Sequence, residues 1–333
     1  MSGTRMQRSD LPHFDALWDY SQPAKTEQTF RHVLQQTLQT APAAYRAELW
    51  TQIARAQGLQ RQFDAAHATL DQVERQLATA CAADVPAGAE AAAAGHAADV
   101  VRADGGAADA AHARDFQVVR VRYLLERGRV FNSSRQPERA RPLFLGAWEL
   151  ARRIGRDDYA VDAAHMLGII EPPAEAQAWN ERAYALAESS PQPGARRWRA
   201  SLANNLGWAC HARGEYGRAL ELFERALRLR QEQGDRRLIH VARWCVARCL
   251  RSLGRVEEAL AMQRELEADE QHSEEPGYTF EELGECLLAL GQADEARPCL
   301  ARAFERLSRD AGFAEREPQR LERLRRLAAG DAG

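Results

Sequence analysis

One pattern organises this sequence: a pair of amphipathic helices joined at a glycine, which recurs along most of the chain. The clearest copy is residues 200–236, ASLANNLGWACHARGEYGRALELFERALRLRQEQGDR. Apolar residues fall there at helical spacing on both sides of Gly214, and each set forms one packing stripe. Gly207 lies inside the first stripe and lowers helix propensity, so we expect another helix to pass close to it. Because one hairpin cannot bury its own apolar face, neighbouring hairpins must cover it.

Alanines at equivalent places in the second helix set the length of the repeat. Successive ones are separated by 36, 43, 40 and 37 residues. They are Ala140, Ala176, Ala219, Ala259 and Ala296. The hairpins defined around these alanines, with one earlier copy, cover roughly residues 44–77, 116–155, 159–190, 200–236, 240–268 and 278–307. Most of the chain therefore repeats a single supersecondary unit.

The residues of the clearest hairpin resemble the tetratricopeptide repeat family. That family pairs Leu-Gly on the first helix with spaced Ala, Phe and Ala on the second. This chain has Leu206-Gly207, followed by Ala219, Phe223 and Ala226. The family period is about 34 residues, so the longer spacing here predicts longer second helices. The resemblance implies an all-α fold, a right-handed α-solenoid of about six hairpins with a degenerate N-terminal half-repeat and a C-terminal capping helix.

The same pattern divides the chain into five segments. We expect a flexible N-terminus over residues 1–22, the half-repeat and first hairpin over 23–77, and an insertion over 78–113. The repeat array then covers residues 114–310, and a capping helix with a tail covers 311–333. The insertion is expected because its sequence is rich in alanine, lacks aromatic residues and has too few large apolar side chains for a packed face. The arginine-rich last helix is typical of a solubilising cap.

Composition and charge argue against several classes of function. The formal net charge is -3 over 333 residues, which gives no support to nucleic-acid or membrane binding. No apolar run follows the basic residues of the N-terminus, and no stretch approaches the roughly 20 apolar residues of a spanning helix, so we expect a cytoplasmic protein. The six cysteines lack the spacing of a disulfide framework or a zinc site, so we expect buried thiols, no metal and no cofactor. No phosphate loop or nucleophile motif is present, and we expect no catalysis.

In arrays of this family the first helix of each hairpin lines the concave wall. Candidate binding residues are therefore those on the face opposite the packing stripe. They are Arg122, Arg129, Asn132, His165, Asn204, Trp208, His211, Trp244, Arg248, Arg251 and Tyr278. Arginine can bind a carboxylate through two hydrogen bonds, asparagine can hold an extended backbone, and tryptophan supplies area for an anchor contact. This wall therefore predicts peptide binding.

Simpler explanations remain open for these residues. Trp208 and Trp244 can pack between adjacent first helices, and the arginines can pair with carboxylates of the same wall. Asp162 and His165 lie one turn apart, a spacing more typical of a structural contact than of a catalytic dyad. The pair Glu281-Glu282 resembles a solvated face.

The sequence favours a non-catalytic scaffold or adaptor that binds a protein or peptide on the concave face, with an acidic or C-terminal segment as the candidate ligand. The alternative is a regulatory sensor that binds a small ligand or signalling peptide in the same groove. Relatives that hold the C-terminal carboxylate of chaperones use lysine and asparagine on this wall. Here Asn205 has no lysine beside it, so that activity is not carried over.

Overall fold

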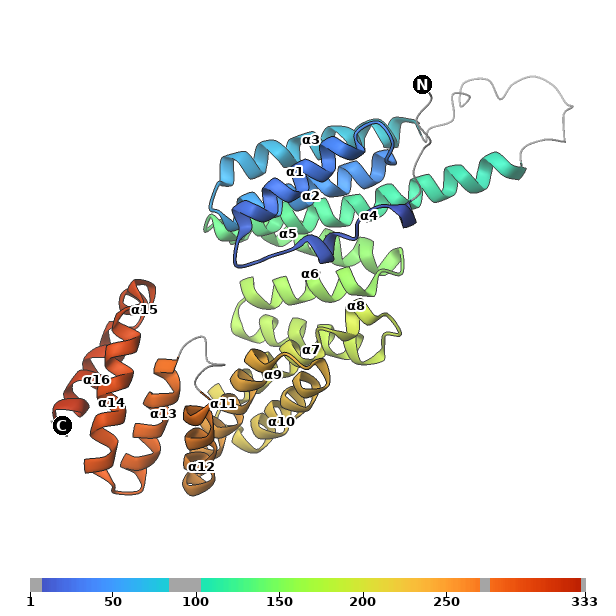
Figure 1. Cartoon of the computed structure of the whole chain (residues 1–333). Coiled ribbons are helices and arrows are strands. Elements are labelled where there is room, and N and C mark those ends of the chain that lie inside the picture. The colour runs from blue at the N-terminus through green and yellow to red at the C-terminus, as the bar shows by residue number, and fades with distance from the viewer. Residues whose placement is uncertain (1–7, 84–102, 270–275, 331–333) are drawn as a thin grey trace, which may run out of the picture. The chain divides into compact units, whose positions relative to one another are not determined.

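The computed structural model describes residues 8–83, 103–269 and 276–330, and every regular element in these ranges is a helix (Figure 1). By its internal contacts the chain divides into Met1–Arg196 and Arg197–Gly333, which we call unit 1 and unit 2. Each predicted hairpin is present as two consecutive helices that pack on each other, so the predicted all-α repeat fold is confirmed. In the part of the chain that the structure describes, no helix is both long and apolar enough to cross a membrane.

Unit 1 begins with two short 3-10 helices and one unpaired α-helix, followed by three hairpins. The opening elements are η1 (Arg8–Asp10), η2 (Phe14–Leu17) and α1 (Pro23–Thr37). The hairpins are α2 (Ala43–Leu59) with α3 (Phe63–Ala83), α4 (Ala103–Ser133) with α5 (Pro137–Arg153), and α6 (Asp157–Ile170) with α7 (Pro173–Ser189). The short helix α8 (Pro193–Arg196) ends the unit.

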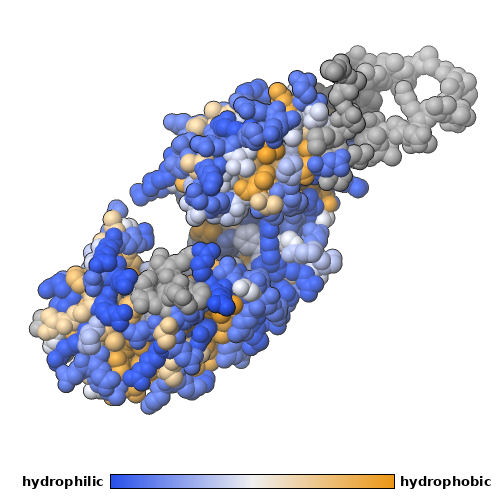
Figure 2. Space-filling model, in the orientation of Figure 1, coloured by the Kyte–Doolittle hydropathy of each residue, from blue (hydrophilic) through white to orange (hydrophobic). Residues whose placement is uncertain are grey.

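Unit 2 contains three further hairpins and the cap. The hairpins are α9 (Arg199–Ala212) with α10 (Tyr216–Gln233), α11 (Arg236–Ser252) with α12 (Val256–Ala268), and α13 (Pro276–Ala289) with α14 (Ala293–Ser308). The cap consists of α15 (Ala311–Arg316) and α16 (Pro318–Ala329). Leu321 and Leu324 of α16 are buried against the core of the unit, as the cap prediction requires. The face drawn in Figure 2 is mostly hydrophilic with small hydrophobic patches, because the apolar stripes lie between helices.

Glycine on the first helix lets the two helices of a hairpin approach closely. A Cβ built on Gly207 would lie 2.7 Å from the ring of Phe223 in α10. The same contact occurs in unit 1, where a Cβ on Gly128 would lie 2.5 Å from the ring of Phe144. The close approach predicted at Gly207 is therefore confirmed, and the partner is the aromatic residue of the same hairpin.

The turns of the hairpins differ between the units. In unit 2 each turn has a glycine at positive φ: Gly214 at 76°, Gly254 at 80° and Gly291 at 75°. In unit 1 the α2–α3 and α4–α5 turns have arginine there instead, with φ of 61° at Arg61 and 63° at Arg135. A side chain with a Cβ is strained in this left-handed region, so unit 1 tolerates a cost that unit 2 avoids.

Two of the expected segments differ from their sequence-based bounds. Residues 1–7 lie outside the described residues, but Leu11 and Phe14 are buried within the range expected to be flexible. Helices α3 and α4 extend into the range 78–113 from its two sides, and residues 84–102 lie outside the described residues. The insertion between hairpins therefore stays a prediction for residues 84–102 alone.

Candidate functional site

The candidate site residues lie on the faces of the first helices that point away from the packing stripes. We call this face the first-helix wall of each unit. It is formed by α2, α4 and α6 in unit 1, and by α9, α11 and α13 in unit 2. Since the two units are separate bodies, each wall is described by itself.

The wall of unit 2 carries a ladder of aromatic rings on consecutive hairpins. The ring centroids of Trp208 and Trp244 lie 6.0 Å apart, and those of Trp244 and Tyr278 also lie 6.0 Å apart. Phe313 of α15 continues the ladder at 5.8 Å from Tyr278. The indole Nε1 of Trp244 donates a hydrogen bond of 3.2 Å to the carbonyl of Tyr278. Both tryptophans are therefore packed, yet they remain partly exposed on the wall.

The arginines of α11 on this wall are held by a carboxylate of α13, the first helix of the next hairpin. Arg248 Nε lies 2.8 Å from Glu282 Oε1, and Arg251 Nε donates to Glu282 Oε2 at 2.8 Å. Burial raises the pKa of the Glu282 carboxyl above its usual value, although Arg251 and Arg248 oppose the shift. Glu281 and Glu282 are 5% and 3% exposed, which corrects the expectation that they form a solvated face.

The capping helix α16 also contributes to this wall. Arg320 donates to both carboxylate oxygens of Glu281, at 2.7 and 2.6 Å, and Arg323 pairs with Glu285. These two arginines of the cap are therefore more than solubilising groups. They extend the row of ion pairs from α11 through α13 to the end of the array.

A cavity of about 480 Å³ lies between these side chains. It is lined by Trp208, Trp244, Arg248, Arg251, Glu281, Glu282, Glu285, Arg320 and Arg323. Four guanidinium groups and three carboxylates therefore face a space bounded on one side by indole rings. Such a lining offers fixed donors and acceptors together with apolar contact area, which suits a ligand with both polar and apolar groups.

His211 and Asn204 lie on the same face as Trp208. His211 Nε2 is 2.9 Å from the hydroxyl of Ser252, which also accepts a 2.8 Å hydrogen bond from Arg248. Burial lowers the pKa of His211, and the charges of Arg248 and Arg251 lower it further. Both effects favour the neutral imidazole. Asn204 is half-buried one turn before Trp208.

Five lining residues are not among the predicted binding residues: the three glutamates of α13 and the two arginines of α16. One signal could have marked two of them, Glu285 and Arg320. Arg251, Glu285 and Arg320 are spaced by 34 and 35 residues, which places them at equivalent positions of successive repeats. Charges that alternate in sign at the repeat period predict ion pairs between neighbouring helices, just as alternating charges do along one helix face.

The arginines predicted on the wall of unit 1 are paired as well. Arg122 Nε lies 2.6 Å from Glu48 Oε1 and 2.7 Å from the hydroxyl of Tyr159. Arg129 donates to Glu126 at 2.7 Å and also pairs with Asp162. Glu48 is 1% exposed, so its pair with Arg122 is a buried ion pair.

On the same wall, Asp162 belongs to the ion pair of Arg129. Burial of Asp162 tends to raise the pKa of its carboxyl, but Arg129 and Arg55 outweigh that effect and lower it. Since Arg129 holds the Asp162 carboxylate, the structural interpretation of Asp162 and His165 is favoured over a catalytic dyad. Asn132 lies half-buried at the end of α4.

A segment of the chain itself covers the wall of unit 1 at α2 and reaches α4 (Figure 1). The hydroxyl of Tyr45 donates to the carbonyl of Pro12 at 3.0 Å, and Trp18 Nε1 donates to Gln52 at 2.9 Å. Phe14 is 3% exposed, and its ring lies 4.9 Å from the Tyr45 ring. We call residues 8–22 the N-terminal segment. Helix α1 corresponds to the second helix of a hairpin, and the N-terminal segment lies where the first helix of that hairpin would be.

Most of the cysteines whose side chains the structure describes are buried. In the ranges that the structure describes, no three or more His, Cys, Asp or Glu side chains are grouped so that they could hold a metal ion. Cys210, Cys245, Cys249 and Cys286 are buried free thiols. Burial raises the pKa of Cys245 to about 12 and that of Cys249 to about 11, so both are protonated at neutral pH.

Residues 171–232 match the family model described as the tetratricopeptide repeat. This stretch of the chain therefore has the tetratricopeptide repeat pattern. The matched range covers the third hairpin from its turn onward and nearly all of the fourth, α9 with α10. No curated protein matches the sequence.

Several solved structures resemble this tetratricopeptide fold. The apo form of RapI is 10% identical with a TM-score of 0.62, covering 90% of this chain and 76% of RapI. NprR in complex with its cognate peptide NprX is 13% identical with a TM-score of 0.54, covering 96% of this chain and 83% of NprR. Aspartyl phosphate phosphatase F from Bacillus subtilis is 12% identical with a TM-score of 0.54, covering 99% of this chain and 82% of the phosphatase chain. At these identities the likeness is one of fold.

Proposed function

We propose that this chain is a non-catalytic scaffold that binds a peptide or protein segment on the first-helix wall of unit 2. The observation that carries the proposal is the cavity of about 480 Å³ between the indole rings of Trp208 and Trp244 and the row of ion pairs. Tryptophan and arginine are the residues that most often dominate binding energy at protein interfaces.

The N-terminal segment supports a peptide as the ligand. On the wall of unit 1 it is held by an aromatic contact at Phe14, a side-chain bond to the carbonyl of Pro12 and an indole hydrogen bond from Trp18. A first-helix wall of this chain can therefore hold an irregular stretch of backbone with aromatic anchors. NprR, which has a similar fold, was solved with a peptide, the same class of ligand.

The charges of the cavity favour an acidic or C-terminal segment. Its lining carries one guanidinium more than it carries carboxylates, so an added carboxylate balances the charge. The arginines already make hydrogen bonds to glutamates, and an incoming carboxylate must share or replace them. We therefore expect selectivity for charge to be larger than its contribution to affinity.

A binding experiment on two variants separates the anchor from the charge. Peptides are selected from a displayed random library against the full chain, and their affinities are measured by calorimetric titration from low to high salt. Trp208→Ala should weaken binding by ~2 kcal/mol at every salt concentration. Arg248→Gln should weaken binding at low salt and flatten the salt dependence, because added salt screens charge pairs. Arg251 remains on Glu282 in that variant, so the carboxylate is not left unpaired.

Arg228→Gln is the matched control, since Arg228 is exposed on α10 outside the cavity lining. It should bind the selected peptides with the parent affinity. Melting temperatures of all variants show whether they fold. If folded Trp208→Ala and Arg248→Gln chains both bind as the parent does, the wall of unit 2 is not the binding site.

A further inference from the structure

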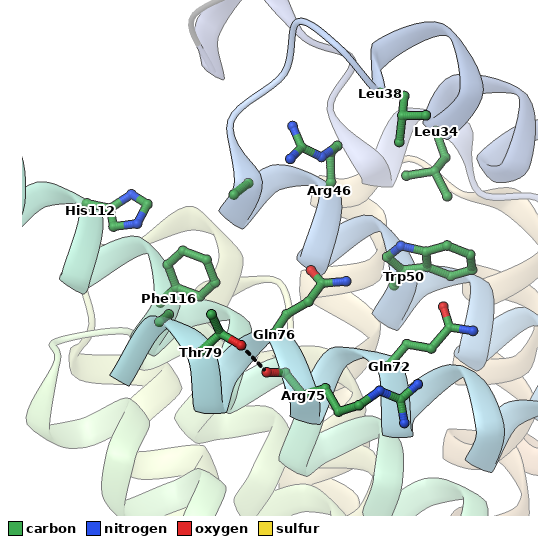
Figure 3. A pocket seen from close by; sticks show the side chains of 12 residues that line it. Leu34, Leu38, Arg46, Trp50, Gln72, Arg75, Gln76, Thr79, His112 and Phe116 are labelled. Atoms are coloured by element: carbon green, nitrogen blue, oxygen red, sulfur yellow. Dashed lines mark hydrogen bonds between the residues drawn. The ribbon is translucent and has the colours of Figure 1, made fainter. Parts of the chain in front are cut away.

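A second hollow lies in unit 1, away from the first-helix wall. It is a groove of about 690 Å³ between α1 and α3, with α2 as its floor and α4 at one end (Figure 3). We call it the α1–α3 groove. It is lined by Leu34, Leu38, Ala43, Arg46, Trp50, Gln72, Arg75, Gln76, Thr79, Ala80, His112 and Phe116. None of these residues belongs to the candidate wall described above.

The apolar part of the groove is formed by residues from three helices. Figure 3 shows Leu34 and Leu38 above the indole of Trp50, with Phe116 at the opposite end. Trp50 and Phe116 are only half-buried, and Leu38 is 55% exposed. Leu38 is among the most exposed large apolar side chains of the described residues. An apolar group that covers Leu38 and the exposed part of the Trp50 indole removes apolar surface from water, which lowers the free energy of the complex.

The polar part of the groove is basic. Arg46 and Arg75 line it together with His112, and no lining residue is acidic. The Arg46 side chain donates to the carbonyl of Ala41. Within the described residues neither Arg46 nor Arg75 is paired with a carboxylate, whereas the arginines lining the cavity of unit 2 are paired. The charge of this groove is therefore available to a ligand.

The amides of Gln72 and Gln76 and the hydroxyl of Thr79 follow one another along α3 beside the arginines. The two amides can donate to and accept from a peptide backbone, whereas the Thr79 hydroxyl donates to the carbonyl of Arg75 at 3.0 Å and can only accept from a ligand. A lining that combines an apolar cleft, two guanidinium groups and a row of amides matches an extended acidic peptide better than it matches a purely apolar ligand.

We propose that the α1–α3 groove binds an acidic segment of a partner protein, in which a bulky apolar side chain stands next to a carboxylate. The apolar side chain packs between Leu38 and Trp50. Carboxylates of the segment pair with Arg46 on one side of the groove or with Arg75 on the other. This site is independent of the wall of unit 2, so the chain can hold two segments.

The test uses peptides selected from a displayed random library against the full chain, then sorted by the variant that abolishes their binding. A class rich in Asp or Glu next to a large apolar residue should lose about tenfold in affinity on Arg75→Glu. The same class should lose a similar factor on Leu38→Ser, without a change in salt dependence. Arg75 and Leu38 are both exposed, so neither change disturbs the core.

Charge reversal gives the sharpest readout. A peptide of this class with every acidic residue replaced by lysine should bind Arg75→Glu better than it binds the parent chain. Arg153→Glu is the control, because Arg153 is exposed on α5 and does not line the groove. Trp208→Ala should leave this class unaffected, which distinguishes the groove from the wall of unit 2.

Two results would overturn the proposal. In the first, no selected peptide responds to Arg75→Glu or Leu38→Ser, or the responding peptides are not acidic. In the second, the chain forms a dimer in sedimentation equilibrium that Leu38→Ser dissociates, which assigns the groove to a second copy of this chain instead.

Discussion

The first-helix walls of the two units are built from the same kinds of residue and are used differently. In unit 1 the N-terminal segment lies over the wall, and Phe14 is buried between α1 and α2. In unit 2 the equivalent face leaves Trp208 and Trp244 partly exposed beside a cavity. The comparison shows that the sequence of the wall alone does not decide whether it is a binding surface. What covers the wall decides it.

The same comparison explains the charged residues. Each wall has arginines paired with carboxylates of a neighbouring first helix, as Arg122 of α4 pairs with Glu48 of α2 and Arg248 of α11 with Glu282 of α13. These pairs tie successive hairpins together in both units. They stabilise the stacking of the hairpins. A ligand that binds the arginines of unit 2 would therefore compete with ion pairs that also hold the hairpins together.

The largest expected effect comes from removing the aromatic anchor of the covered wall. Phe14→Ala should destabilise unit 1 by about 4 kcal/mol, because it deletes a fully packed ring and leaves a cavity. Trp244→Ala in the wall of unit 2 should cost that unit clearly less, since its indole is only half-buried. Hydrogen exchange read by mass spectrometry reports each unit separately. Equal losses in the two units would contradict the distinction between a covered and a partly exposed wall.

The buried ion pair of unit 1 should be more sensitive than the outer pair of unit 2. Glu48→Ala leaves Arg122 buried without its carboxylate, at a cost of about 3 kcal/mol. Glu285→Ala should cost no more than ~1 kcal/mol, because its partner Arg323 remains accessible to water. Urea unfolding of the two variants checks the order. A smaller effect for Glu48→Ala than for Glu285→Ala would show that burial does not set the cost.

The glycine contacts should cost the same in both units. Gly207→Ala and Gly128→Ala each place a Cβ against an aromatic ring, and we expect a loss of about 2 kcal/mol in each case. Gly217→Ala is the control, since no atom lies within 4 Å of its Cβ and α10 gains helix propensity. It should stabilise unit 2 slightly. Wild-type stability for Gly207→Ala would mean that α9 and α10 can move apart at no cost.

Acid should affect the two walls in opposite directions. The pKa of Asp162 is lowered in the folded chain, so its contribution is present above pH 3.8 and is lost as the pH falls through the folded value. The pKa of Glu282 is raised, so its contribution is present at low pH and is lost as the pH rises through the folded value. Asp162→Asn should therefore destabilise most at pH 7. Glu282→Gln should destabilise least there, and unfolding from pH 7 to 3 compares them.

The smallest effect concerns the turns and should stabilise unit 1. Arg61→Gly and Arg135→Gly relieve a residue with a Cβ at positive φ, and each should add roughly 0.5–1 kcal/mol. Gly214→Ala in unit 2 should have the opposite sign. Thermal unfolding of the three variants measures this. If the arginine turns are not stabilised by glycine, strain is not what distinguishes the turns of the units.

The fold could be predicted from the sequence because its determinants are local and periodic. The stripe around Gly207 and the recurring alanines specify helix pairs without knowledge of distant contacts. The bounds of the N-terminal segment could not be predicted in this way. Phe14 is one aromatic residue outside any repeat, and its burial depends on the empty place beside α1.

The sequence could predict only those site residues that lie on the same face of each first helix. Trp208, Trp244, Arg248 and Arg251 line one cavity, as their shared face suggested. Glu281 and Glu282 looked solvated because helical spacing does not show which residues of neighbouring helices oppose them. The α1–α3 groove was not predicted, because it joins residues of four helices, from Leu34 to Phe116, with no common period.

The stacked tryptophans give the wall of unit 2 an optical property. Trp208 and Trp244 lie with centroids 6.0 Å apart and ring planes tilted by 38°, close enough for their excited states to couple. Each indole belongs to a different hairpin, so the coupling depends on the angle between neighbouring repeats. Near-ultraviolet circular dichroism of the unlabelled chain is therefore a direct gauge of how this part of the array bends, with or without a ligand in the cavity.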